Sequence, residues 1–154
     1  LSVFNIGLAT LGLVHIVIGT ILFFENLKAR PTKYNVYKNP GGLMIGSNCM
    51  PYTGILILIF VIFHLFKFTF VDKSVNPIYQ LMAATFTNPL WVLFYVVAMA
   101  IVAVHISHAF WSMFQTFGIN HPCHMPLIMK LGLVVTLVFG IGFGILPIYL
   151  LIIA

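Results

Sequence analysis

Four long apolar runs make up most of this chain, and short stretches rich in charge, glycine and proline separate them. A hydrocarbon core about 30 Å thick is crossed by roughly 20 apolar residues in a helix. We therefore predict four membrane-spanning helices within one domain over residues 1–154, at about residues 3–24, 52–71, 89–117 and 127–153. Backbone groups in lipid must be satisfied within a helix or a closed barrel, so the predicted fold class is an all-α, integral membrane helical bundle.

Local signals mark several helix boundaries. Pro51 suits the first turn of the second span, and Asn88 followed by Pro89 is typical of an N-cap and a first helical position. The segment 77–87 between the second and third spans predicts a short interfacial helix. Pro147 predicts a kink in the fourth span, where nearby glycines allow close helix approach.

Composition excludes a water-soluble fold. Hydrophobic residues account for 62% of the chain and charged residues for 6%, with a mean hydropathy of +1.13. Soluble domains have about a quarter of their residues charged. The formal net charge of +5 rests on seven basic residues, too few for a surface that follows a phosphate backbone. We therefore expect lipid, and no nucleic acid, as a partner.

The basic residues predict the orientation. The loops 25–51 and 118–126 should face the cytoplasm, because basic residues concentrate on that side of a membrane. These residues are Lys28, Arg30, Lys33 and Lys38, with Lys130 at the start of the last span. Both chain ends would then face outward. Since the chain begins with Leu1 inside an apolar run, we expect a further helix to precede it.

The predicted cytoplasmic loops contain both cysteines, Cys49 and Cys123, which should be reduced there. The run His121-Pro-Cys-His124 resembles part of a metal site but has too few ligands for structural zinc. We interpret it as a polar loop at the level of the lipid headgroups.

Histidines within the spans are the candidate functional residues: His15, His64, His105 and His108. Ionisable residues inside a membrane are rare and usually functional. Any one of them could instead form a hydrogen bond between helices. Three separate spans carry one, however, and a neutral imidazole is a good axial ligand for haem iron. We therefore predict that they bind haem between the helices of the bundle.

Depth in the membrane indicates how these ligands pair. With a rise of 1.5 Å per residue, His15 lies about 14 Å and His105 about 18 Å from the cytoplasmic ends of their spans. His64 lies roughly 10 Å from the opposite end of its own span. His15 and His105 are thus predicted to share an inner haem. His64 would serve an outer haem, with a partner ligand outside this chain.

Several runs of residues together resemble a known family. They are Leu13-Val-His15-Ile-Val-Ile-Gly19, Tyr52-Thr-Gly54, Ile62-Phe-His64-Leu65 and the long stretch from His105 through Trp111 and Gly118 to Pro122. The chain resembles the cytochrome b membrane anchor of succinate:quinone oxidoreductases and fumarate reductases, in the single-subunit, di-haem class. The resemblance covers nearly the whole chain, and the stretch from His105 to Pro122 is its most specific part.

The resemblance implies five spans, of which this chain matches the last four. His15 and His105 match the axial ligands of the inner haem b, and His64 matches a ligand of the outer haem b. The partner of His64 would lie on the missing first span or on a further small membrane subunit. His108 lies one helical turn from His105 on the same face, and we expect it to contact a haem propionate or a neighbouring helix rather than to be an axial ligand.

The resemblance also implies partners and a location. A flavoprotein subunit and an iron–sulfur subunit would dock on the cytoplasmic side of a prokaryotic inner membrane, and succinate or fumarate chemistry would take place there. This multi-pass chain would pass electrons between the iron–sulfur subunit and a quinone, menaquinone or ubiquinone. Tyr52, Trp111, Ser112 and Gln115 are candidates for an inner quinone site, although they suit interfacial and interhelical contacts equally well.

Two other functions remain open from the sequence. One is a haem-free structural anchor whose histidines only form hydrogen bonds. The other is a proton or ion carrier that uses its histidines as a relay. A relay needs several titratable groups across the membrane, and the near absence of carboxylates within the spans argues against it.

Overall fold

The structure is a computed structural model that describes residues 3–29, 45–74 and 77–153. Its described residues form helices joined by short turns, without strands, and four of the helical segments are long and apolar enough to cross a membrane. The predicted all-α membrane bundle with four spans is confirmed. The chain divides into two compact units, residues 1–43 and 44–154, which we describe separately.

The first unit contributes one apolar helix, α1 (Val3–Ala29). Two of its threonine side chains form hydrogen bonds within the helix. The hydroxyl of Thr10 donates to the backbone carbonyl of Ile6, and that of Thr20 donates to the backbone carbonyl of Ile16. Helix α1 continues past the predicted end at residue 24. The basic residues Arg30, Lys33 and Lys38 lie outside the described residues.

The second unit contains the other three spans. The second span, Cys49–Thr69, combines most of α2 with a π-helical turn, and the fourth, Met125–Ile153, has a π-helical turn near its middle. In chain order the elements are α2 (Ile45–His64), η1 (Leu65–Thr69), α3 (Ile78–Phe86), α4 (Pro89–Thr116), α5 (Met125–Leu137), η2 (Val138–Gly142) and α6 (Phe143–Ile153).

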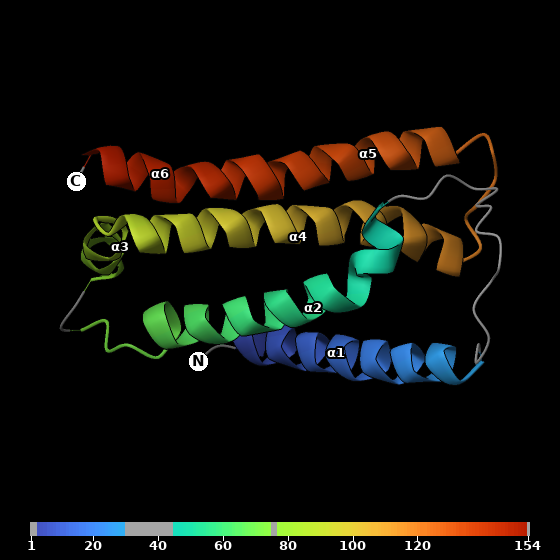
Figure 1. Cartoon of the computed structure of the whole chain (residues 1–154), viewed down its shortest axis with the longest axis horizontal. Coiled ribbons are helices and arrows are strands. Elements are labelled where there is room, and N and C mark those ends of the chain that lie inside the picture. The colour runs from blue at the N-terminus through green and yellow to red at the C-terminus, as the bar shows by residue number, and fades with distance from the viewer. Residues whose placement is uncertain (1–2, 30–44, 75–76, 154) are drawn as a thin grey trace. The chain divides into compact units, whose positions relative to one another are not determined.

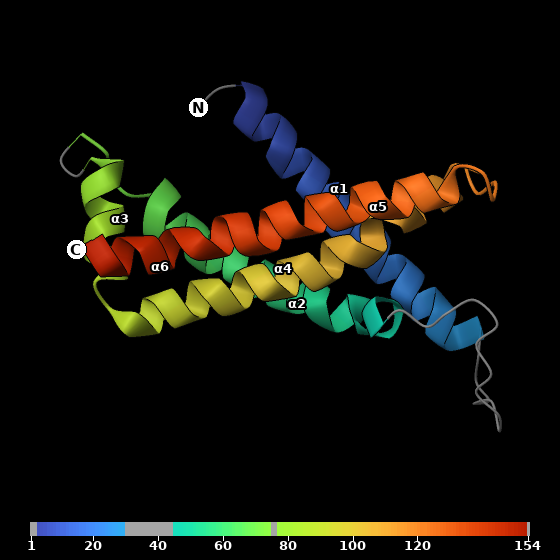
Figure 2. The same ribbon diagram turned by 90° about the horizontal axis from the view of Figure 1, so that it is seen from above.

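Helix α4 is the centre of this unit. It packs against α2 on one side and against α5, η2 and α6 on the other (Figure 1). The short helix α3 lies across the end of the unit, where it contacts α4, α6 and η1 (Figure 2). Any polar contact between α2 and the last span must therefore pass through α4.

The boundary signals around α4 are mostly confirmed. The side chain of Asn88 accepts a hydrogen bond from the backbone N–H of Leu90 at 2.9 Å, and Pro89 occupies the first helical turn. The predicted interfacial helix exists as α3. After α4, Gly118 adopts a φ of 77°, a left-handed conformation that glycine reaches at little cost and that reverses the chain toward α5.

The prediction that Pro51 begins a helix is wrong. Pro51 lies inside α2, which already starts at Ile45. Proline in a helix interior removes one backbone hydrogen bond. Membrane helices tolerate this because neighbouring helices and hydroxyl side chains satisfy the freed groups. The polar and glycine-containing residues before Pro51 concealed this additional helical turn.

Aromatic residues fill the end of the unit near α3. Phe68, Phe86, Val92, Tyr95 and Leu150 form its buried core, drawn from η1, α3, α4 and α6. The ring of Tyr95 meets Phe86 edge to face at 5.1 Å between ring centres, a favoured geometry for aromatic pairs. By contrast, most other large apolar side chains are exposed, as lipid-facing surfaces require.

Small residues allow the last span to approach α4 closely. A Cβ atom added at Gly140 would lie 2.9 Å from the Cβ of Ala103, closer than such atoms can pack. At Gly132 the added atom would lie 3.0 Å from the ring of Phe110. A Cβ atom at Gly142, in the same π-helical turn as Gly140, would meet nothing within 4 Å. A side chain is therefore excluded by close packing at Gly140 and has open space at Gly142.

This contrast yields a prediction about stability. Gly140→Ala should lower the free energy of unfolding by about 1–3 kcal/mol, the usual cost of overpacking. Gly142→Ala, which makes the same change in the same turn, should cost nothing measurable. Unfolding of the purified variants in mixed detergent micelles, followed by circular dichroism, measures both. Equal stability of the two variants would contradict the close approach at Gly140.

Candidate functional site

The four candidate histidines fall into both units. His15 lies near the middle of α1, in the first unit. His64, at the last residue of α2, and His105 and His108, on α4, lie in the second. Because the two units are described separately, the pairing of His15 with His105 stays a prediction.

His105 is held by a hydroxyl group of the neighbouring helix. Its Nδ1 lies 3.0 Å from Oγ1 of Thr53, on α2. The same Oγ1 donates to the backbone carbonyl of Cys49 at 2.9 Å and lies 3.1 Å from that of Met50. Thr53 is buried, and the imidazole also lies beside the adjacent Gly54, where an added Cβ atom would be in ordinary van der Waals contact with its Cε1 at 3.7 Å.

His64 makes the equivalent contact in the opposite direction. Its Nδ1 lies 3.3 Å from the phenolic oxygen of Tyr95, on α4. The imidazole also lies among aromatic rings, with Phe60 at 5.8 Å and Phe68 at 5.5 Å between ring centres. Helix α2 gives way to the π-helical turn η1 immediately after His64. Single π-helical turns of this kind are frequently found at functional sites.

The two contacts form a reciprocal pattern. The hydroxyl of Thr53 on α2 is hydrogen-bonded to His105 on α4, and the hydroxyl of Tyr95 on α4 is hydrogen-bonded to His64 on α2. His64 bonds to Tyr95, which precedes His105 by ten residues on α4, so the contacts lie about 15 Å apart along the helix. At that separation His64 and His105 cannot be the two axial ligands of one iron atom.

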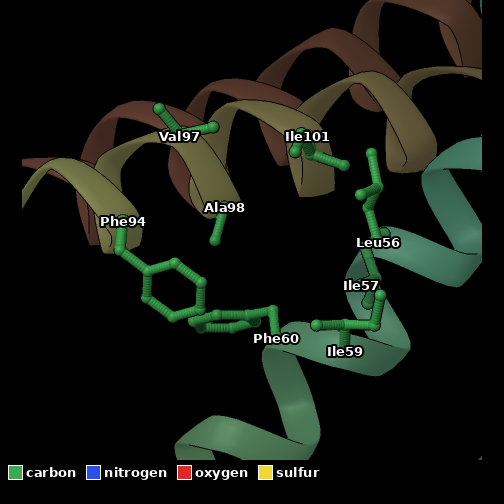
Figure 3. Close-up of a pocket in the computed structure, with 8 residues that line it drawn as sticks. All are labelled: Leu56, Ile57, Ile59, Phe60, Phe94, Val97, Ala98 and Ile101. Carbon is green, nitrogen blue, oxygen red and sulfur yellow. The ribbon is translucent and has the colours of Figure 1, made fainter. Parts of the chain in front are cut away.

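A shallow apolar hollow separates the two contacts. It has a volume of about 160 Å³ between α2 and α4, and Figure 3 shows the rings of Phe60 and Phe94 at one end of it. Its lining consists of Leu56, Ile57, Ile59, Phe60, Phe94, Val97, Ala98 and Ile101. A porphyrin does not fit a hollow of this size, so a macrocycle bound by either histidine would occupy another face of α2 or α4.

His108 differs from the other two candidate histidines of its unit, His64 and His105. Its Nδ1 is buried and has no hydrogen-bond partner in the structure, and neither has the buried Nε1 of Trp111 one turn later. The two rings meet edge to face at 5.0 Å between centres. Orphaned polar atoms of this kind often mark a place for water or a ligand. The secondary haem contact expected of His108 stays a prediction.

Two charged residues, Lys67 and Asp72, lie at the α3 end of the unit. The Nζ atom of Lys67 lies 5.2 Å from the ring centre of Trp91, a cation–π contact at the α3 end of the unit. Nearby, hydrogen bonds from the hydroxyl and backbone N–H of Ser74 hold the pKa of the exposed Asp72 carboxyl below its usual value. Both polar groups therefore lie at the end of the unit that the basic residues predict to face outward.

The loop between α4 and α5 does not gather metal ligands. The backbone N–H of Cys123 donates to Nδ1 of His121, and the rings of His121 and His124 lie 5.9 Å apart. Within residues 3–29, 45–74 and 77–153, no three histidine, cysteine, aspartate or glutamate side chains form a group that could hold a metal ion. An axial pair for haem iron needs only two ligands and is a different arrangement.

Sequence reasoning missed Thr53 and Tyr95, the hydroxyl partners of the two histidines. The available signal was their polarity, because a hydroxyl within an apolar span needs a partner. Their pairing depends on the register between α2 and α4, which one sequence does not reveal.

The comparisons with known proteins leave the family open. A scan against family models, a search of characterised proteins and a search of solved structures find no match to this chain.

The contact between His64 and Tyr95 yields a second prediction. Tyr95→Phe keeps the aromatic packing and removes only the hydroxyl, so it should lower the free energy of unfolding by about 0.6 kcal/mol, the average for a hydrogen bond between membrane helices. Tyr149→Phe is the matched control, because Tyr149 is more than half exposed on α6. Detergent unfolding curves measure both, and a control variant as unstable as Tyr95→Phe would argue against the hydrogen bond.

Proposed function

We propose that this chain is the haem b-containing membrane anchor of a succinate dehydrogenase or fumarate reductase, passing electrons between an iron–sulfur subunit and a membrane quinone. The observation that carries the proposal is the reciprocal pattern on α2 and α4. Each imidazole is held at Nδ1 by a hydroxyl within an apolar helix pair. The family resemblance from His105 to Pro122 supports the same assignment.

The residues present fit a haem ligand set. Histidines that bind a metal through one ring nitrogen almost always engage the other nitrogen with a hydrogen-bonding partner. His64 and His105 both meet this condition at Nδ1. The rings of Phe60 and Phe68 beside His64 are apolar, which suits the apolar faces of a porphyrin. The 15 Å between the two contacts suits two separate haem groups, one for each histidine.

Each residue has a stated task in this proposal. His105 and His15 would hold the inner haem, and His64 would hold the outer haem with a ligand from elsewhere. Haem supplies a one-electron redox centre when bound. Thr53 and Tyr95 orient the imidazoles, while the apolar walls of α2 and α4 exclude water. The basic loop residues would face a flavoprotein and an iron–sulfur subunit at the cytoplasmic surface of a prokaryotic inner membrane.

One alternative has a specific observation in its favour. The bonds from Thr53 to His105 and from Tyr95 to His64 link α2 to α4 directly. A haem-free structural anchor would use its histidines in this way. A proton relay has less support, because the two carboxylates of the chain, Glu25 and Asp72, both lie near the ends of spans.

Optical spectra test the proposal. The chain, purified from a haem-producing host, should show the reduced-minus-oxidised bands of low-spin haem b, and the pyridine haemochrome assay should count one or two haem groups per chain. His105→Leu should remove one haem per chain because the inner iron loses an axial ligand. His121→Leu, in the loop before α5, is the matched control and should keep the full haem content.

A chain that folds and shows no haem bands would contradict the proposal and favour the structural anchor. Retention of all haem by His105→Leu would contradict the assignment of that ligand. The pairing can be tested in the same assay, because His15→Leu should remove the same haem as His105→Leu.

A further inference from the structure

We propose that Thr53 is a positioning residue that fixes His105 in its Nδ1–H tautomer, so that Nε2 is the ring nitrogen that would bind a metal. The effect of this tautomer on a bound haem rests on the proposed function. The geometric basis of the tautomer, however, is the hydrogen bonding of Thr53, which is independent of any bound group.

The hydroxyl of Thr53 has a single hydrogen to share among three neighbouring acceptor or donor atoms. A threonine hydroxyl has one hydrogen to donate and two lone pairs that accept. Oγ1 of Thr53 lies 2.9 Å from the carbonyl oxygen of Cys49 and 3.1 Å from that of Met50. Carbonyl oxygens only accept, so the single hydroxyl hydrogen must point toward them. The remaining contact of Oγ1, with Nδ1 of His105 at 3.0 Å, must then be one in which Oγ1 accepts.

The opposite arrangement is unfavourable. If the hydroxyl donated to Nδ1 of His105, the lone pairs of Oγ1 would face the carbonyl oxygens of Cys49 and Met50 at hydrogen-bonding distance with no hydrogen between them. In an apolar interior such repulsion is poorly screened. Nδ1 of His105 therefore carries the hydrogen, and in a neutral imidazole Nε2 is then the unprotonated nitrogen.

Packing holds the imidazole in this orientation. Thr53 and Gly54 are consecutive on α2, and the ring edge from Nδ1 to Cε1 lies against them. A Cβ atom at Gly54 would already be in van der Waals contact with Cε1. Rotation of the ring would break the bond to Thr53, and the loss of a hydrogen bond within a span is costly in lipid.

Tyr95 does not impose the same choice on His64. In the described part of the chain, the phenolic oxygen of Tyr95 is hydrogen-bonded to His64, and no carbonyl oxygen accepts its hydrogen. Tyr95 can therefore donate to Nδ1 or accept from it, and both tautomers of His64 are satisfied. The two histidines thus differ in a specific way, and only His105 has its tautomer set by its partner.

The consequence for a bound metal follows from ligand basicity. A hydrogen bond donated by Nδ1–H makes Nε2 a stronger electron donor. A stronger donor stabilises ferric over ferrous iron, so Thr53 would lower the midpoint potential of the inner haem. Loss of such an outer hydrogen bond typically weakens metal binding by 10-fold to 100-fold.

Two readouts test the inference. In the haem-free chain, ¹⁵N NMR of histidine-labelled protein in nanodiscs should show His105 protonated at Nδ1. Thr53→Val, which replaces the hydroxyl by a methyl group of similar size, should abolish this preference, and Thr53→Ser should restore it. In the haem-loaded chain, Thr53→Val should shift the potential of the inner haem to more positive values and lower haem affinity about 10-fold or more. Thr53→Ser should leave both near the wild-type values.

The matched control is Thr136→Val on α5. Thr136 donates to the carbonyl of Gly132 in the same pattern as Thr53 but lies on α5 rather than on α2, so its replacement should leave both readouts unchanged. His105 protonated at Nε2 in the wild-type chain would overturn the inference even if Thr53→Val does not fold. So would a Thr53→Val variant with an unchanged tautomer and potential. A chain without haem bands that still shows the Thr53-dependent tautomer refutes the proposed function and leaves this inference standing.

Discussion

The lack of water inside the bilayer is the constraint on which this structure depends. A polar atom within a span must find a partner in its own helix or in a neighbouring one. Threonine hydroxyls satisfy this requirement repeatedly along their own helices, as at Thr10, Thr20 and Thr136. An imidazole cannot reach its own backbone in this way and needs a second helix. The contacts of His64 and His105 between α2 and α4 are the result.

These contacts also explain why α4 is central. It shares both histidine contacts with α2, and it offers small residues to the last span on its other side, where Ala103 faces Gly140. Polar bonding therefore fixes the register on one side of α4, and close backbone approach fixes the packing on the other. The aromatic core around Tyr95 closes the α3 end of the unit. Consequently α4 has little freedom to slide against either neighbour.

The parts of this fold that could be predicted are those set by local sequence. The spans follow from the length of apolar runs, and the start of α4 follows from Asn88 and Pro89, whose capping geometry involves adjacent residues. The extra turn before Pro51 and the two π-helical turns could not be predicted, because they reflect how the backbone adjusts to its neighbours. The histidines were visible from the sequence as rare polar residues. Their hydroxyl partners were not, since Thr53 and His105 are 52 positions apart.

A structural and a metal-binding role for these histidines are compatible, because an imidazole has two nitrogens with separate tasks. Nδ1 of His105 is hydrogen-bonded to Thr53, and in the proposed function this bond would prepare Nε2 to act as a ligand. His108 offers the contrast, since its buried Nδ1 has no partner that would fix its tautomer or orientation. Of the two histidines of α4, the one bonded to another helix would therefore be the better axial ligand in the proposed function. The hydrogen bond to Thr53 is compatible with a purely structural histidine and also supports the proposal that His105 binds haem iron.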